Sequence, residues 1–444
     1  MITKEEIQEI LNKALSLVSA EQAELVLFGG ESSLTGFANN YIHRNVKENN
    51  YSLNLRVAYG KKVGASSTNN FSTEGLESLV EAAQNIAMLQ KENENFVSFA
   101  KDEKSIDFAI EVDKEDVSPD FRAEYVKRIV DKSKEKGFIA SGIFENARQH
   151  IAVKNSLGVE HYGEFTYATL KSVVMTDTSS GYSIETKVKA KDISLESVLD
   201  ESIWIAENSR NPGTIEPGKY EVILTPYALS EFIGAMTYLS INARAVEQGT
   251  SFLIGRLGEK IFPDLISLCD DGLSDCTIPL PFDFEGVPKK KVVFFEKGVA
   301  KEIVYDTFYA YKANRQSTGH SLPQPNPYSP YPMNLIMEGG DSSKDDLIKN
   351  VKRGLYVQRF WYTNPMDPRN LLITGMTRDG LFLIEDGKIT RPVKNMRFTE
   401  SIINAFNNCL ELSKERKIMY DGGSSITVPY ARIKDFNFTS GTEF

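Results

Sequence analysis

The stretch YSLNLRVAYGKKVG, residues 51–64, decides the fold class of the first part of the chain. Its apolar and polar residues alternate, with Tyr51, Leu53, Leu55 and Val57 on one side of the backbone. A period of two is typical of a β-strand with one buried face and one face in water. The following YGKKVG at 59–64 favours a tight turn into a second strand, so the stretch predicts a β-hairpin.

Helical patterns flank this hairpin on both sides. Upstream, Thr3 and Glu6 form a capping-box pattern, after which apolar residues repeat at helical spacing as far as Val18. Downstream, a second helical pattern begins near Ser72 and continues to Ala87. Helix, strands and helix in this order predict an α+β fold.

The middle of the chain repeats this mixture of elements. Residues 91–117 are charged and weakly periodic, as a connector between folding units would be. Ser118 followed by Pro119 predicts a new helix start. Strand-like runs fill residues 138–189, and a further helix is expected near 195–208.

The clearest boundary is the proline- and glycine-rich run RNPGTIEPGKY, which we place near residues 210–219. A chain of 444 residues is too long for one ordinary hydrophobic core, so its length predicts several folding units. We therefore predict an N-terminal α+β domain at 1–105, a middle α+β segment at 106–215 packed with the first, and a β-rich C-terminal domain at 216–444.

Two hairpin patterns dominate the last part of the chain. VVFFEKGVAKEIVYD at 292–306 and LFLIEDGKITRPV at 381–393 each place apolar runs on both sides of a Lys-Gly or Asp-Gly turn. Thr225 and Pro226 predict a helix start ahead of them. Strand edges need protection, so this part is also the expected assembly surface, with the cleft inside it.

Between the hairpins lies SLPQPNPYSPYP, residues 321–332, whose five prolines remove backbone donors and favour extended backbone. Two interpretations stay open. The run is either a stiff surface loop or the rim of a cleft that presents Tyr328 and Tyr331 to an extended ligand.

Charge and cysteine content exclude several classes of protein. With 51 Lys and Arg against 61 Asp and Glu, the formal net charge is −10, which argues against direct binding of nucleic acid. The cysteines are Cys269, Cys276 and Cys409, an odd number without CxxC spacing, so neither a disulfide framework nor a zinc ribbon is predicted.

The first twenty residues carry charged side chains where a secretory signal would need an apolar core. No apolar run of 18 residues follows. We therefore expect a soluble cytoplasmic protein with no membrane association.

Six segments, in this order and spacing, resemble the TldD/PmbA family, also called modulators of DNA gyrase or U62-type metallopeptidases. They are FANNYIHRNVKENNYSLNLRVAYGKKVGASSTNNFS, GTSFLIGRLGEKIF, PFDFEGVPKKKVVFFEKGVAKEIVYD, STGH, VKRGLYV and LIEDGKITRPVKN. The resemblance covers nearly the whole chain. It implies an α+β N-terminal half, a β-rich C-terminal domain and assembly into dimers.

The family has two kinds of subunit. The TldD kind carries H-E-x-x-x-H on a helix and a later cysteine, which hold zinc for proteolysis. The PmbA kind, also called TldE, lacks these ligands and pairs with the catalytic subunit. The resemblance places the metal helix on SEFIGA, residues 230–235, counted back from Gly-Thr-Ser at 249–251.

The two histidine positions of that helix are Ser230 and Ala235 here, while Glu231 and Gly234 match the family pattern. Zinc needs imidazole, thiolate or carboxylate ligands. The run IMYDGGSSITVPY at 418–430 has glycine and serine where TldD subunits have cysteine. The resemblance thus implies a PmbA-like chain; we predict no cofactor and assign no catalytic residue, zinc belonging to active relatives.

Three hypotheses follow. In the first, the chain is the zinc-free partner of a TldD-like catalytic subunit in a peptide-processing protease assembly. In the second, it is an active metallopeptidase with substitute ligands such as Glu231 and His320, a histidine that the family resemblance puts near the cleft. In the third, it is a non-catalytic homodimer that binds peptides along the proline-rich loop through Tyr328 and Tyr331.

Overall fold

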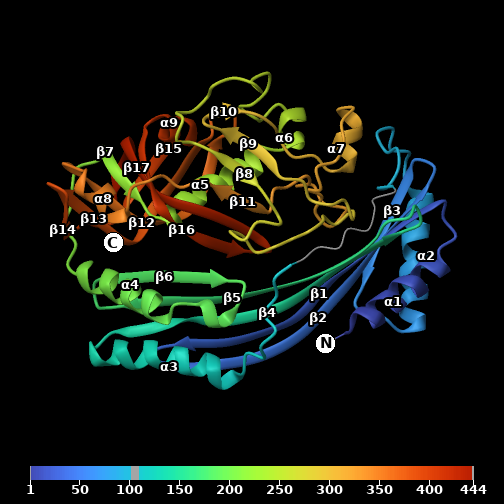
Figure 1. Cartoon of the computed structure of the whole chain (residues 1–444), viewed down its shortest axis with the longest axis horizontal. Coiled ribbons are helices and arrows are strands. Elements are labelled where there is room, and N and C mark those ends of the chain that lie inside the picture. Colours follow the sequence, from blue (N-terminus) through green and yellow to red (C-terminus); the bar gives the residue numbers. More distant parts are fainter. Residues whose placement is uncertain (1, 102–109, 443–444) are drawn as a thin grey trace.

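The computed structural model describes residues 2–101 and 110–442 and shows an α+β fold in two units (Figure 1). The first unit is built on a six-stranded antiparallel sheet in the order β3-β2-β1-β4-β5-β6. Its strands are β1 (Gln22–Ala38), β2 (Tyr41–Tyr59), β3 (Lys62–Thr68), β4 (Ile139–Asn155), β5 (Glu160–Met175) and β6 (Ser180–Lys187). Because β1 pairs with both β2 and β4, strands from before and after the 91–117 connector share one sheet.

Helices pack on one face of this sheet. They are α1 (Lys4–Leu17), α2 (Thr73–Leu89), α3 (Pro119–Glu135), the short 3-10 helix η1 (Ala190–Asp192) and α4 (Leu195–Asn208). Alternate residues of β1 separate the two faces: Leu25 and Leu27 pack with α1 and α2, whereas Val26 packs with loops of the second unit. The sheet therefore packs against helices on one face and faces the second unit with the other, and Figure 1 shows α3 on the side of the sheet away from the second unit.

The second unit holds an eleven-stranded sheet. Its strands are β7 (Gly218–Leu224), β8 (Leu268–Asp270), β9 (Val292–Glu296), β10 (Val299–Ala300), β11 (Asn334–Met337), β12 (Arg353–Asp367), β13 (Leu372–Glu385), β14 (Lys388–Pro392), β15 (Met396–Ser401), β16 (Cys409–Asp421) and β17 (Ser424–Gly441). Strands β7, β12, β13, β15 and β17 pair in a closed ring, since β17 bonds to both β15 and β7.

The core of the second unit is aromatic. Phe232 of helix α5 (Pro226–Leu239) packs against Phe360, Phe398 and Phe436 of three ring strands, with ring centroids 5.7, 6.4 and 6.1 Å away. The remaining helices are short: α6 (Ala243–Glu247), α7 (Thr307–Lys312), α8 (Lys344–Lys349) and α9 (Ile402–Asn407). Packing of α5 on the ring fixes which of its faces can point outward.

Local sequence signals locate several elements. The Thr3–Glu6 capping box forms, with the Thr3 backbone N–H donating to the Glu6 carboxylate at 2.7 Å. The Lys-Gly and Asp-Gly turns join β9 to β10 and β13 to β14, and Gly298 and Gly387 have φ values of 74° and 75°, which glycine adopts without strain. The expected border between residues 105 and 106 lies outside the described residues.

The residues described by the structure contain no helix that is both long enough and apolar enough to cross a membrane. All three cysteines are free thiols; Cys269 and Cys409 are buried and Cys276 is partly exposed.

Candidate functional site

A cavity of about 790 Å³ lies between the open face of the first sheet and the outward face of α5. Strands β4, β5 and β6 form one wall through Glu145, Tyr167, Lys171 and Tyr182, among others. The opposite wall consists of α5, part of β12 and the β16–β17 turn. The cavity thus needs both units, so the expectation of a cleft inside the C-terminal part alone is wrong: the first sheet supplies one wall.

Helix α5 divides its residues between core and cavity. Leu229, Phe232, Ile233 and Met236 are buried in the second unit. Ser230, Glu231, Gly234 and Ala235, at the intervening positions, line the cavity. The helix begins at the Thr225 cap, whose hydroxyl accepts a hydrogen bond from the Tyr227 N–H at 3.2 Å, and Pro226 occupies its first turn. The SEFIGA segment therefore forms part of the wall of this cavity.

Glu231 projects into this cavity, so its side chain is accessible while the walls around it exclude much water. This enclosure raises the pKa of Glu231, an effect that Thr363 and Arg359 oppose and Asp421 reinforces. A carboxyl group with a raised pKa can take up or release a proton nearer neutral pH.

Tyrosines dominate the polar lining. Six contribute to it: Tyr167, Tyr182, Tyr227, Tyr238, Tyr331 and Tyr420. Tyr167 and Tyr420 pack with ring centroids 4.5 Å apart, and the Arg359 guanidinium lies 4.2 Å from the centre of the Tyr182 ring. Burial raises the pKa of Tyr182 to about 12, so its hydroxyl stays protonated and able to donate.

A buried ion pair joins the two units beneath the cavity. Glu201 of α4 accepts hydrogen bonds from Lys417 of β16 at 2.7 Å, Tyr227 of α5 at 2.6 Å and Ser183 of β6 at 2.7 Å. Burial alone would raise the pKa of Glu201, but Lys417 and the hydrogen bonds from Tyr227 and Ser183 together outweigh burial, so the pKa is lowered. The pair therefore holds the walls of the cavity together through an ionised carboxylate.

The cleft candidates from the proline-rich loop lie in different places. Tyr331 lines the cavity, and its hydroxyl accepts a hydrogen bond from Thr237 at 3.1 Å. Tyr328 is 48% exposed and packs against Tyr238 with ring centroids 5.5 Å apart.

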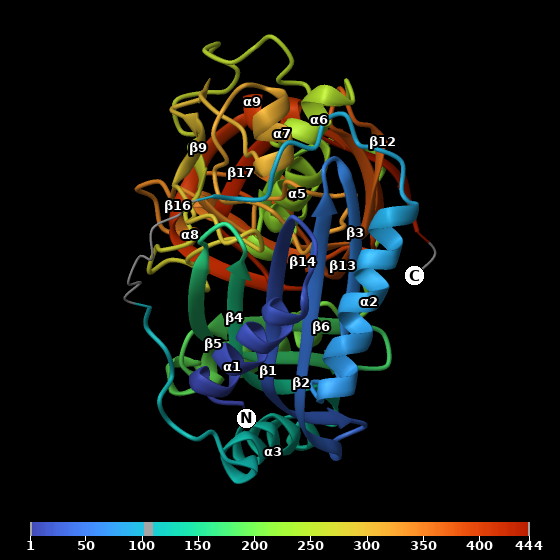
Figure 2. The same ribbon diagram turned by 90° about the vertical axis from the view of Figure 1, so that its right-hand side faces the viewer.

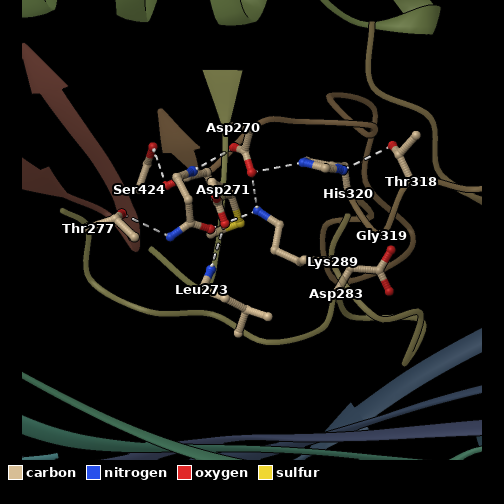
Figure 3. A network of polar contacts seen from close by, with 12 residues as sticks. Asp270, Asp271, Leu273, Thr277, Asp283, Lys289, Thr318, Gly319, His320 and Ser424 are labelled. Carbon is tan, nitrogen blue, oxygen red and sulfur yellow. Dashed lines mark hydrogen bonds and ion pairs between the residues drawn. The ribbon is translucent and has the colours of Figure 1, made fainter. Parts of the chain in front are cut away.

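His320 sits in a separate buried network (Figure 3). Its Nε2 is 2.9 Å from Oδ1 of Asp270, which also accepts from Lys289 at 2.9 Å, and its Nδ1 is 3.0 Å from the Thr318 hydroxyl. Lys289 also donates to Asn334 at 2.7 Å. Burial opposes ionisation of Asp270, but Lys289 and His320 hold its pKa below the usual range. Both ring nitrogens of His320 are thus engaged within the second unit.

Parts of the site carried no local sequence signal. Tyr167, Thr169 and Lys171 of β5 alternate along the strand and all face the cavity. That period of two predicts a shared face, but not which unit lies opposite. Arg359 and Asp421 reach the cavity from β12 and from the end of β16, strands that lie far apart in the sequence.

The fold and this interdomain cavity define a two-unit α+β protein with a ligand-sized cleft between its units. Residues 217–440 match the model of the PmbA/TldA metallopeptidase C-terminal domain, and residues 23–87 match PmbA/TldA metallopeptidase domain 1. The chain belongs to the PmbA/TldD metallopeptidase family.

Three curated relatives are each about a quarter identical to this chain over the residues that align. A metalloprotease PmbA homolog of Haemophilus influenzae is 24% identical over 83% of this chain and 82% of its own length. An uncharacterized protein of Methanocaldococcus jannaschii is 28% identical, and a metalloprotease of Methanothermobacter thermautotrophicus is 26% identical. This chain spans 61% and 42% of the length of those two relatives.

Two solved structures share the fold. TldE from Thermococcus kodakarensis superimposes with a TM-score of 0.85 at 19% identity, over 98% of this chain and 99% of that one. A protein of Bacteroides thetaiotaomicron, described as a candidate modulator of DNA gyrase, gives a TM-score of 0.84 at 22% identity over the full length of both chains.

The residues at the cavity do not fit the zinc of a metallopeptidase. Ser230 and Ala235 offer no imidazole, and Gly422, Gly423 and Ser424 offer no thiolate. Across residues 2–101 and 110–442, no three His, Cys, Asp or Glu side chains converge as a metal site would require.

Proposed function

We propose that the chain is a PmbA/TldE-like subunit that binds an extended peptide in the tyrosine-lined cavity and pairs with a zinc-bearing, TldD-like catalytic chain. The observation that carries this proposal is the wall formed by α5. This helix carries the segment that the family resemblance assigns to the metal helix, and it lines the cavity with Ser230 and Ala235 at the two histidine positions.

The cavity suits a peptide in size and chemistry. Its 790 Å³ lie within the usual range for ligand sites of about 300–1,000 Å³. Tyrosine hydroxyls can donate to and accept from a peptide backbone, while the ring faces pack on side chains. The cavity is lined by cations at Lys171 and Arg359 and by carboxylates at Glu145, Glu231 and Asp421, so it can interact with ligand groups of either charge.

The same geometry counts against the second hypothesis. An active site with substitute ligands needs Glu231 and His320 near one water molecule. Glu231 lies in the cavity wall, whereas His320 is bound by Asp270 and Thr318 inside the second unit. The peptide-binding homodimer differs from our proposal in its partner, and the assembly measurement below separates the two.

The first prediction concerns zinc. Purified with zinc in excess and then desalted, the chain is expected to retain far less than one zinc ion per chain, because two ligand positions hold Ser230 and Ala235. The measurement is metal analysis by mass spectrometry. The matched comparison is the double variant Ser230→His and Ala235→His, which should hold more zinc. Near-stoichiometric zinc on the unaltered chain would overturn the proposal.

Assembly is tested in the same preparation. Mixed with a TldD-like chain, the protein should form a complex whose fixed stoichiometry is measured by light scattering. The complex should cleave peptides, and a chelator should abolish this cleavage. Cleavage by the isolated chain that is lost in Glu231→Gln would instead support the active-peptidase hypothesis. Stable homodimers that bind peptides but do not associate with the TldD-like chain would support the third hypothesis, the peptide-binding homodimer.

The second prediction compares two tyrosines of one loop. Tyr331→Ala should weaken binding of an unstructured peptide about tenfold, because it removes a ring and a hydroxyl from the cavity wall. Tyr328→Ala, its matched control, should leave the affinity within about twofold. Fluorescence anisotropy of a labelled peptide panel provides the measurement. Equal losses for both variants would place the binding surface on the outer loop instead.

A further inference from the structure

A second cavity, of about 460 Å³, lies at the other end of the contact between the units. Strand β3, the end of α2 and the loop 93–99 form one side, and α7 with the proline-rich loop forms the other. Figure 2 shows α7 and β3 in the same upper region of the molecule. The proline-rich loop, through residues 324–327 and 329, therefore walls a space distinct from the tyrosine-lined cavity.

Aromatic side chains supply most of the apolar wall of this second cavity. Phe96 and Phe99 come from the loop after α2, and Phe308, Tyr309 and Tyr311 come from α7. Pro325 and Pro327 add rigid apolar surface. Such walls suit a ligand with a flat or aliphatic body.

One edge of the same cavity is acidic. Glu285 and Asp306 line it, and Arg56 is the single cation among the described lining residues. Arg56 already lies between two carboxylates, 2.6 Å from Glu24 and 3.1 Å from Glu285. Asp306 caps α7, accepting from the Tyr309 N–H at 2.8 Å, and binds the proline-rich loop through the Ser329 hydroxyl at 2.7 Å.

The buried carboxyl groups around Arg56 outnumber the cations. Glu285 and Asp306 line the cavity, Glu24 and Asp283 are not among its lining residues, and all four are at least nine-tenths buried. Arg56 pairs with Glu24 and Glu285. Oε2 of Glu24 is buried with no hydrogen-bond partner among the residues described. A buried carboxylate without compensation is costly, so such a group either protonates or acquires a cation.

At neutral pH, Glu24 and Asp306 are near the midpoint between their protonated and ionised forms. The pKa values of Glu24 and Asp306 are raised to about 7, chiefly by burial and also by Glu285, although Arg56 opposes the rise. Burial and Glu285 also hold the pKa of Asp283 well above its usual value. A cation entering beside these groups would favour their ionised forms and displace protons.

From the cavity, its aromatic walls and the shortage of buried positive charge, we infer that it binds a small organic cation, with the ammonium or guanidinium head at Glu285 and Asp306 and the apolar body among Phe99, Phe308 and Tyr311. Aromatic faces add cation–π attraction to the attraction of the carboxylates. The apolar walls and the absence of a converging ligand trio in the described residues distinguish the site from one for a metal ion.

Three matched probes test this inference on the full chain by titration calorimetry. Phenethylamine carries the cation, phenethyl alcohol is neutral and phenylacetate carries the opposite charge. The amine should bind at least about tenfold more tightly than the alcohol, and phenylacetate more weakly than either. Repeating the amine titration near pH 7 in buffers of different ionisation enthalpy should show protons released on binding.

Variants assign the effect to the cluster. Asp306→Asn keeps a side chain able to cap α7. It should lower the affinity for the amine about tenfold and leave the affinity for the alcohol unchanged. Glu302→Gln removes a carboxylate paired with Arg315 just before α7, outside the cavity lining, and should change neither probe. Ala65→Phe, which places a ring into the cavity from β3, should weaken all probes.

Several results would overturn the inference. These are no saturable binding of the amine, equal affinity for the three probes, proton uptake instead of release, or an equal loss in Glu302→Gln and Asp306→Asn. If Asp306→Asn loses its cooperative thermal transition, the unaltered chain and Ala65→Phe still decide the question.

Discussion

Replacing Asp270 with asparagine is expected to lower the free energy of unfolding by about 3–5 kcal/mol. The reason is that Lys289 loses its ion-pair partner. The side chains of Asp270 and Lys289 are 0% and 1% exposed, so the variant buries an ammonium group without its counterion. Urea denaturation followed by circular dichroism measures the change.

The neighbouring residue supplies the control. Asp271 is 22% exposed and lies 3.7 Å from Lys291, so Asp271→Asn should cost less than about 1 kcal/mol. Adding Lys289→Met to Asp270→Asn should restore part of the lost stability, because the buried charge disappears with its partner. Equal costs for the two asparagine variants would show that Lys289 is not held as a buried cation.

The second large effect is expected from Lys417→Met, which should lower the free energy of unfolding by about 2–3 kcal/mol at neutral pH. Glu201, 15% exposed, would keep the Tyr227 and Ser183 donors but lose its only ion-pair partner in the described residues. Because Trp204 of α4 packs against Phe382 of β13 with ring centroids 5.4 Å apart, its fluorescence should report loosening between the units.

The pH dependence identifies the cause. In the unaltered chain Glu201 has a pKa below its usual 4.5, so the pair stabilises the fold above that pH and is lost as the pH falls through the lowered value. The difference between Lys417→Met and the unaltered chain should therefore shrink as the pH falls below 4.5 and through the lowered pKa of Glu201. Lys414→Met, exposed on the same strand, should change stability little at any pH. A difference that is constant with pH would assign the loss to packing.

Local patterns predicted elements wherever one face of an element is buried. The alternation at 51–57 marks the part of β2 that packs under α2, but β2 begins at Tyr41. Nearly all of residues 41–50 are exposed, so no burial imposes alternation on them, and only pairing with β1 keeps them extended. Local patterns could not predict the closed ring either, because it depends on pairing between strands far apart in the chain, such as β7 and β17.

The candidate site divides in the same way. SEFIGA could be located because it lies on one helix with a familiar spacing, and all four of its singled-out positions line the cavity. The tyrosines of β5 and β6 could not, because they become part of the site only when the first sheet meets α5. His320 shows the converse: a residue type suited to catalysis is engaged inside a buried network by Asp270, a residue 50 positions away.

The position of β17 sets the order in which a ribosome-bound chain can fold. The six-stranded sheet is complete in sequence once β6 has emerged, so the first unit can fold during synthesis. The second unit cannot follow stepwise, because β7, β11, β15 and β16 all pair with β17, which follows each of them in the sequence. Until β17 has emerged, the aromatic side of α5 has no ring to close around it. A nascent chain at that stage carries a first unit able to fold and a second unit whose apolar surface stays exposed to aggregation.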